Sequence, residues 1–208
     1  MSPLRAPFTF AAMAAALAGC VSVLPEPPPP PRIYQLTAGP ATAVGPQALT
    51  ASSVVVAVAL PGGPRALMGS EIAWSTDGVL RYVAGAEWAG RAPDLLQAAL
   101  AEAVDGSGLV RAGVRSGAGV RADYEIAWDV TAFQVEEEDG AITARFAAVA
   151  RLVDARTRLL VAQTRVDETW PVAARSQAEA TQALESATRD AVSRIARELA
   201  AEAAEPQS

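Results

Sequence analysis

Between residues 124 and 170 the sequence alternates apolar and polar side chains over three long runs separated by turn residues. In Tyr124–Val130 every second residue is large and apolar, which is typical of a strand with one buried face. Asp139-Gly140 follows, and this dipeptide favours a two-residue hairpin turn. The return run, 141–153, and a third run, 159–170, complete the pattern. The three runs predict an antiparallel meander.

The alternation changes parity inside the first run. Apolar residues stand at even positions up to Val130 and at odd positions from Phe133. One extra residue in a strand produces such a shift, so we expect a β-bulge or a strong local twist between these two residues.

Shorter strands are predicted upstream of the meander. One of them, SVVVAVAL, is continuously apolar and β-branched, as expected of a strand buried on both faces. Another pair flanks Asp77-Gly78, a second hairpin signal. The expected ranges of these strands are 33–36, 53–60, 71–75, 79–84 and 109–114.

Two segments have the periodicity of amphipathic helices. The first begins near Pro93 and ends at Gly106. The second begins at Ser176 and Glu179, which have capping-box spacing, and carries an apolar stripe up to Leu199. Together the elements predict an α+β, two-layer domain over 32–204, in which two amphipathic helices cover a mainly antiparallel or mixed β-sheet. Residues 205–208 are a short tail.

The composition limits the chemistry of the chain. There is no histidine and no lysine, and 17 arginines stand against 23 acidic residues, for a net charge of −6. Without an imidazole, a histidine-based proton relay and a His-ligated metal site are excluded. No arginine-rich stripe is present, so a nucleic-acid partner is not expected. We predict no catalytic residue, no cofactor and no metal site.

The acidic run Glu136-Glu137-Glu138-Asp139 leaves a hydrolase as an alternative. Paired carboxylate catalysis needs two groups that converge across about 5–9 Å. Neighbouring side chains of a strand point to opposite faces, and four adjacent acids before a hairpin turn are typical of a solvated loop, so we interpret this run as such a loop.

The first twenty residues have the layout of a secretory signal peptide. Arg5 precedes an apolar run that is too short to span a bilayer comfortably. Leu17, Ala18, Gly19 and Cys20 match the bacterial lipobox, and Cys20 is the only cysteine in the chain. We therefore predict a signal peptide at 1–19 and a lipidated Cys20; a buried N-terminal helix is the alternative.

A proline-rich segment follows the cysteine. Pro25 and the run Pro27–Pro31 favour the extended polyproline II conformation. Residues 20–31 are therefore interpreted as the lipidated cysteine and a semi-rigid spacer that holds the domain away from the bilayer.

The order of these features resembles the ABC-type transport auxiliary lipoproteins of the paraquat-inducible protein C type. The resemblance covers nearly the whole mature chain. It rests on the lipobox at Cys20 and on the segments YQL, VAVALPGG, EIAWSTDGVLRYVAGAEWAGRAPDLLQAAL, DYEIAWDVTAF and RLVDARTRLL. The chain departs from the family at Leu67–Ser70, where an aromatic residue and an Asp-Arg pair are common.

The resemblance implies a non-catalytic accessory lipoprotein of an intermembrane transport system for phospholipid or similar hydrophobic solutes. The implied partners are an MCE-domain protein and an ABC permease and ATPase, with homo-oligomerisation left open. Val21, in place of an aspartate after the cysteine, implies the periplasmic face of the outer membrane rather than the inner membrane. Exposed aromatics are the expected partner surface, with Trp74, Trp88 and Trp170 as candidates. The alternative function is a periplasmic lipid-binding carrier with an apolar pocket.

Overall fold

The computed structural model describes residues 29–37 and 52–205. The chain divides into two units, Met1–Pro30 and Pro31–Ser208, and the fold below is that of the second unit. The predicted signal peptide, the lipobox residues Leu17 to Cys20 and most of the proline spacer lie outside the described residues.

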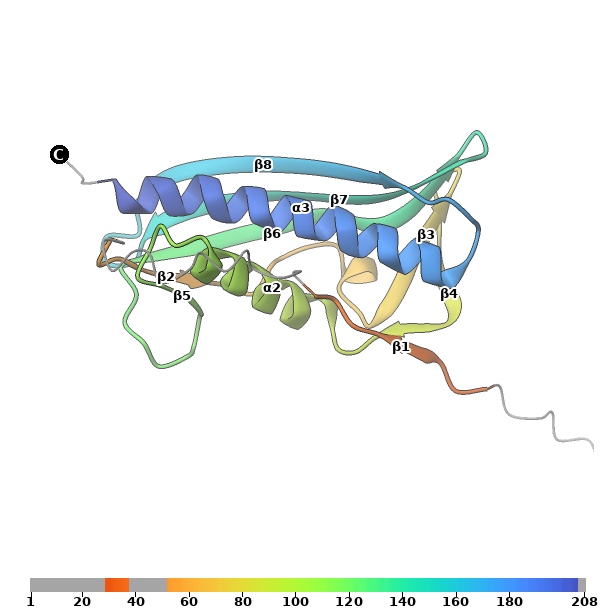
Figure 1. Ribbon diagram of the computed structural model, residues 1–208, viewed down its shortest axis with the longest axis horizontal. Coiled ribbons are helices and arrows are strands. Elements are labelled where there is room, and N and C mark those ends of the chain that lie inside the picture. The colour runs from red at the N-terminus through yellow and green to blue at the C-terminus, as the bar shows by residue number, and fades with distance from the viewer. Residues whose placement is uncertain (1–28, 38–51, 206–208) are drawn as a thin grey trace, which may run out of the picture. The chain divides into compact units, whose positions relative to one another are not determined.

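The second unit contains one mixed sheet of eight strands (Figure 1). Three long antiparallel strands form the predicted meander: β6, Tyr124–Glu138; β7, Ala141–Asp154; and β8, Leu160–Pro171. The shorter strands are β1 (Arg32–Tyr34), β2 (Val55–Val58), β3 (Glu71–Thr76), β4 (Val79–Trp88) and β5 (Ala112–Arg115). A 3-10 turn, η1, spans Arg65–Leu67.

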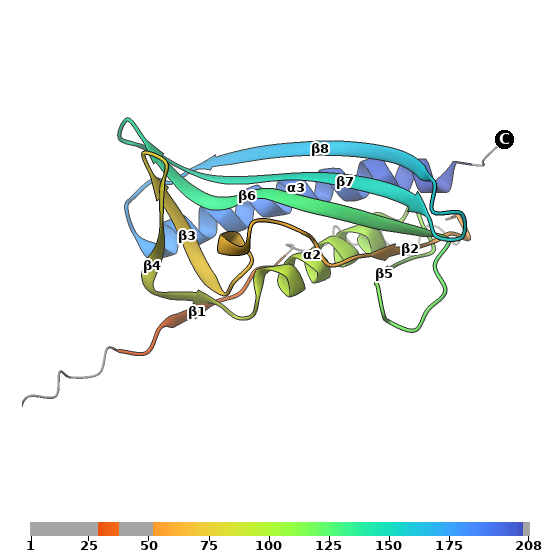
Figure 2. The same cartoon turned by 180° about the vertical axis from the view of Figure 1, so that it is seen from behind.

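The sheet forks at β6. One edge of this strand pairs with β7 along its length. The other edge pairs in parallel with β2 near Tyr124 and with β3 near Val135. β5 extends the sheet beyond β2, whereas β4 and then β1 extend it beyond β3 (Figure 2). Each half of β6 therefore has its own neighbours.

The register of β6 against β7 shifts between Val130 and Ala132. The extra residue in the strand explains why buried apolar side chains change from even to odd positions there. The predicted β-bulge is confirmed.

Both Asp-Gly dipeptides form hairpin turns. Asp77 and Gly78 have φ of 48° and 79°, and Asp139 and Gly140 have φ of 50° and 80°. Positive φ at both central positions is the type I′ geometry, whose twist matches that of the flanking strands. These turns set the registers of β3 against β4 and of β6 against β7.

Two helices lie on one side of the sheet and contact each other. α2 spans Ala92–Gly106, with Pro93 in its first turn, and packs against β2 and β5. α3 spans Gln177–Ala204 and packs along β6, β7 and β8. The side chain of Ser176 accepts a hydrogen bond from Glu179 N (3.2 Å), which is the expected N-cap.

The space between helices and sheet is filled by side chains. Phe146, Ile126 and Leu152 of the sheet are fully buried, as are Leu100 and Leu184 of the helices. On α3, alanines alternate with the larger apolar residues, so its backbone approaches the sheet closely. The predicted two-layer α+β architecture, with a mixed sheet and two covering helices, is confirmed.

Two charged residues of α3, Asp190 and Arg194, bind residues of β8 rather than each other. The spacing of Asp190 and Arg194 predicts a pair on the exposed side of the helix, but Arg194 instead binds Glu168 of β8 at 3.1 Å. Asp190 accepts a hydrogen bond from the indole of Trp170 at 3.0 Å. Partners from the neighbouring strand replace the local one because α3 lies along β8.

Candidate partner-binding site

The three tryptophans expected at a partner surface occupy different environments. Trp88 is only 3% exposed, and its ring stacks on Phe133 with centroids 5.4 Å apart. Phe133 in turn meets the edge of Phe146. Trp88 is therefore a core residue, and its placement on a partner surface is wrong. It ends β4 on the buried face, where the aromatic residue stabilises the sheet.

Trp74 and Trp170 lie on one row of the sheet. The registers place Trp74 beside Val135, Val135 beside Ala144, and Ala144 beside Trp170. Paired residues on adjacent strands point to the same face, so both indoles project to the side that α3 covers. Trp170 keeps 40% of its surface exposed, and Trp74 is half-buried.

A polar cluster holds Trp74 in place. The carboxylate Oε2 of Glu137 accepts hydrogen bonds from Trp74 Nε1 at 3.2 Å and from Thr76 Oγ1 at 3.3 Å. The same oxygen pairs with Arg175 Nη2 at 2.7 Å. The Arg175 guanidinium also lies 5.8 Å from the centroid of the Trp74 ring, within the range of a cation–π contact.

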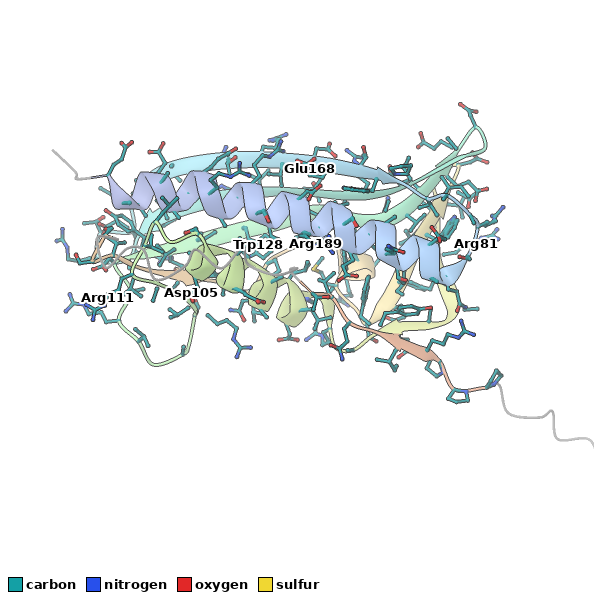
Figure 3. All side chains as sticks on the ribbon, viewed as in Figure 1. Arg81, Asp105, Arg111, Trp128, Glu168 and Arg189 are labelled. Atoms are coloured by element: carbon teal, nitrogen blue, oxygen red, sulfur yellow. The ribbon has the colours of Figure 1, made fainter. Side chains whose placement is uncertain are left out.

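This cluster forms one wall of a surface hollow of about 280 Å³, called here the Trp74 hollow. Arg81, the cross-strand neighbour of Trp74, lines the hollow together with Tyr82 and Val83 of β4, and Ser176 and Gln177 at the start of α3 also line it. Figure 3 shows Arg81 at the hairpin end of the unit. The hollow combines aromatic rings with two arginines, a mixture that is frequent where proteins bind each other.

Exposed apolar side chains extend the hollow onto the β3–β4 hairpin. Val79 is 56% exposed and shares the face of Trp74, whereas Leu80 and the 49% exposed Tyr82 lie on the other face of the two-stranded hairpin. Tyr82 is oriented by its hydroxyl, which donates to Ala66 O at 3.2 Å. We call the Trp74 hollow together with Val79, Leu80 and Tyr82 the hairpin surface.

A second hollow lies at the opposite end of β6. Its volume is about 520 Å³, and its lining includes Arg121, Asp123, Asp154 and Arg156. Both carboxylates serve the local backbone: Asp123 accepts from Val55 N at 2.8 Å, and Asp154 accepts from the turn that follows it. Hydrogen bonds from Thr157 lower the pKa of Asp154. This hollow is lined by two arginines and two aspartates, whereas the hairpin surface also carries exposed apolar side chains.

The acidic run does not form a paired carboxylate site. Glu137 points toward Trp74, whereas Glu136 on the other face pairs with Arg145 at 3.5 Å. Asp139 is in the hairpin turn. Within residues 29–37 and 52–205, no group of three acidic residues is placed to hold a metal ion. The run is not the predicted solvated loop: Glu136 and Glu137 belong to β6 and keep only 19% and 14% of their side chains exposed, because each pairs with an arginine.

Sequence reasoning missed Arg81 and Arg175. The position of Arg81 could have been predicted from the sequence, because a two-residue turn at Asp77-Gly78 sets Trp74 opposite Arg81. Arg175 gives no such signal, since its contact with Glu137 joins residues that are 38 positions apart.

Comparison with known proteins gives a family and a fold. A family model described as "ABC-type transport auxiliary lipoprotein component" matches residues 34–198. A crystal structure from Xanthomonas campestris is 25% identical, with a TM-score of 0.69, and the alignment covers 82% of this chain and 95% of that one. A second structure, of an uncharacterized protein, is 17% identical with a TM-score of 0.61, over 82% and 99% of the two chains. Curated proteins give no significant match.

No helix among the described residues is long and apolar enough to cross a membrane.

Proposed function

Because the chain belongs to the ABC-type transport auxiliary lipoprotein family, we propose that it is a non-catalytic accessory subunit of an MCE/ABC-type intermembrane transport system. The family match carries this proposal, since it covers nearly all of the described fold. In this role the protein docks the transport machinery at the outer membrane. The transported molecule is phospholipid or another hydrophobic solute.

The anchor in this proposal is Cys20, acylated after removal of residues 1–19. One acyl chain gives only marginal membrane binding, whereas two or three chains give stable attachment. The domain itself is acidic overall, so it gains little from anionic lipid surfaces. The lipid therefore holds the protein, and the proline-rich segment spaces the domain from the membrane.

The hairpin surface is the part of the domain that we assign to the partner. It presents exposed aromatic and aliphatic side chains beside two arginines, whereas the hollow at the other end is lined by two arginines and two aspartates. An MCE-domain or permease subunit that encloses the hairpin from both faces buries the Trp74 ring and Val79 on one face and Leu80 and Tyr82 on the other. These side chains then supply the apolar core of an interface, with Arg81 and Arg175 as its charged rim.

The alternative function, a periplasmic lipid-binding carrier with an apolar pocket, has less support. The side chains between α3 and the sheet are fully buried and pack against one another, and both hollows are open to the surface. Lipid bound by the anchor-free protein in native mass spectrometry would favour the carrier.

Two experiments test the proposal. Affinity capture of the full chain from detergent-solubilised membranes should recover an MCE-domain protein together with permease and ATPase subunits. Cys20→Ala should move the protein from the membrane fraction to the soluble fraction. Capture that recovers no transport subunit contradicts the docking role, and a Cys20→Ala protein that stays tightly bound to membranes contradicts the anchor.

A further inference from the structure

The outer edge of β8 carries unpaired backbone groups. Among the described strands, β8 pairs only with β7. Val172 N donates to Ile142 O across this pair at 3.0 Å, and Ala155 N donates to Asp123 O between β7 and β6 at 2.9 Å. In an antiparallel strand successive residues alternate between the two edges, so from Ala162 onward, past the bulge of β8, the even-numbered residues bond to β7. The odd-numbered residues of this stretch face outward.

Two of these outward-facing residues carry opposite charges. Arg165 and Asp167 flank Val166, and their side chains are on the sheet face away from α3. Arg165 makes no ion pair within residues 29–37 and 52–205. Asp167 binds Arg145 at 2.8 Å yet keeps half of its side chain exposed. When two such edges lie antiparallel, Arg165 of each edge can therefore stand opposite Asp167 of the other.

From this pattern we propose that two copies of the chain pair antiparallel through β8 and join their sheets across a two-fold axis at Val166. In this register Arg165 of each copy stands opposite Asp167 of the other, in a hydrogen-bonded position. Asp167 then lies between two guanidinium groups, those of Arg145 and of the second copy's Arg165. The surface is isologous, because both copies contribute the same strand.

The neighbouring registers lack this complementarity. An axis at Arg165 or at Asp167 places like charges opposite each other, which destabilises a strand pair. An axis at Thr164 sets Arg165 against Gln163, and an axis at Glu168 sets Asp167 against Thr169. Only the axis at Val166 pairs the two opposite charges, so charge selects one register among the five.

The same register covers the exposed Trp170 near the end of β8. Trp170 is 40% exposed and lies on the α3 face, whereas Leu160 lies beyond the bulge of β8 and pairs with Val153 on the other face. On the α3 face, Trp170 of one copy stands opposite Ala162 of the other. The small alanine leaves room for the indole. The strand edge therefore offers backbone groups, matching charges and apolar contact to one occupant, a second copy.

The test uses charge reversal in the full chain, purified in detergent and followed by native mass spectrometry over a concentration series. The wild type should form a dimer. Arg165→Asp alone and Asp167→Arg alone each place like charges opposite one another, and each should weaken dimerisation by at least about tenfold. Mixing the two variants restores both ion pairs, so heterodimers should form at wild-type concentration. The mass difference between the variants distinguishes heterodimers from homodimers.

Two further variants make the result specific to this edge. Thr169→Pro removes an outward N–H without affecting the bonds to β7, and it should weaken the dimer with the charges intact. Arg121→Asp, in the loop before β6, makes the same charge change away from β8 and should leave the dimer unaffected. A monomeric wild type, or a mixture that forms no more dimer than the single variants, overturns the proposal. Capture of transport subunits is a separate measurement, so the docking role and the dimer fail independently.

Discussion

The two halves of β6 carry neighbours of different character. Near Tyr124 the neighbour is β2, which is buried on both faces and lies beneath α2, where Gln97 Nε2 donates to Val58 O at 2.9 Å. Near Val135 the neighbour is the β3–β4 hairpin, whose tip is exposed and which borders the Trp74 hollow. One strand thus has a half with buried neighbours and a half with exposed ones, and the second half borders the proposed partner surface. The difference indicates where sequence changes should affect folding and where they should affect binding.

The largest contrast is expected in stability. Ile126→Ala removes a fully buried side chain beside β2 and should lower the free energy of unfolding by about 2–5 kcal/mol. Val79→Ala, at the exposed hairpin, should change it by less than about 0.5 kcal/mol. Urea unfolding followed by circular dichroism measures both. Equal losses in the two variants would remove the distinction between the halves.

Two glycines, Gly113 and Gly78, provide a second stability test of the two regions beside β6. A Cβ on Gly113 of β5 would lie 2.5 Å from Asp105 N and 2.6 Å from Ala101 O, so α2 must shift. Gly113→Ala should therefore cost about 1–3 kcal/mol. Gly78, at the hairpin tip, has open space around it and a φ of +79°, so Gly78→Ala should cost about 1 kcal/mol of backbone strain. Thermal unfolding of the two variants measures which substitution lowers the stability more. A larger loss in Gly78→Ala than in Gly113→Ala would contradict this prediction.

Binding should depend on the open half. Arg175→Ala removes the cation over Trp74 and the ion pair with Glu137, and we expect it to weaken capture of the transport subunits by about tenfold. Arg156→Ala changes the same residue type in the polar hollow at the other end and is the matched control. Both variants should unfold at nearly the wild-type denaturant concentration. Equal capture by the two variants would move the partner site away from the hairpin surface.

The smallest effect concerns pH. Arg158 binds Glu125 at 2.7 Å and lowers the pKa of that carboxyl below its ordinary value of 4.5. The pair therefore stabilises the fold above that value, and its contribution is lost as the pH falls below it. Because Arg158 is largely exposed, Glu125→Gln should cost less than about 1 kcal/mol at pH 7. The difference between wild type and variant should shrink in urea titrations as the pH falls through the lowered pKa of Glu125, because the protonated carboxyl resembles the glutamine. A difference that grows with acidification contradicts this sign.

Local signals in the sequence were sufficient for much of the fold. Both Asp-Gly turns, the bulge after Val130 and the ends of α2 follow from residues that are close in sequence. The fork at β6 does not, because it depends on two parallel pairings with strands that lie about 60 residues upstream. Parallel pairing leaves no turn signal between the partners.

The candidate site was only partly predictable for the same reason. Trp74 and Trp88 both lie in the β3–β4 hairpin, and composition does not distinguish them. Stacking on Phe133 buries Trp88, whereas Trp74 reaches a hollow closed by Arg175 from the loop before α3. Those contacts arise from the tertiary packing of the meander. Cys20, by contrast, is a prediction of the sequence alone and lies outside the described residues.

Site-specific photo-crosslinking in cells tests the central claim most directly. A photoreactive residue at Leu80, on the hairpin surface, should crosslink to an MCE-domain or permease subunit. The same residue at Val120, exposed near the opposite end of β6, should not. Crosslinks to those subunits from Val120 and none from Leu80, or none from either position, would contradict the account.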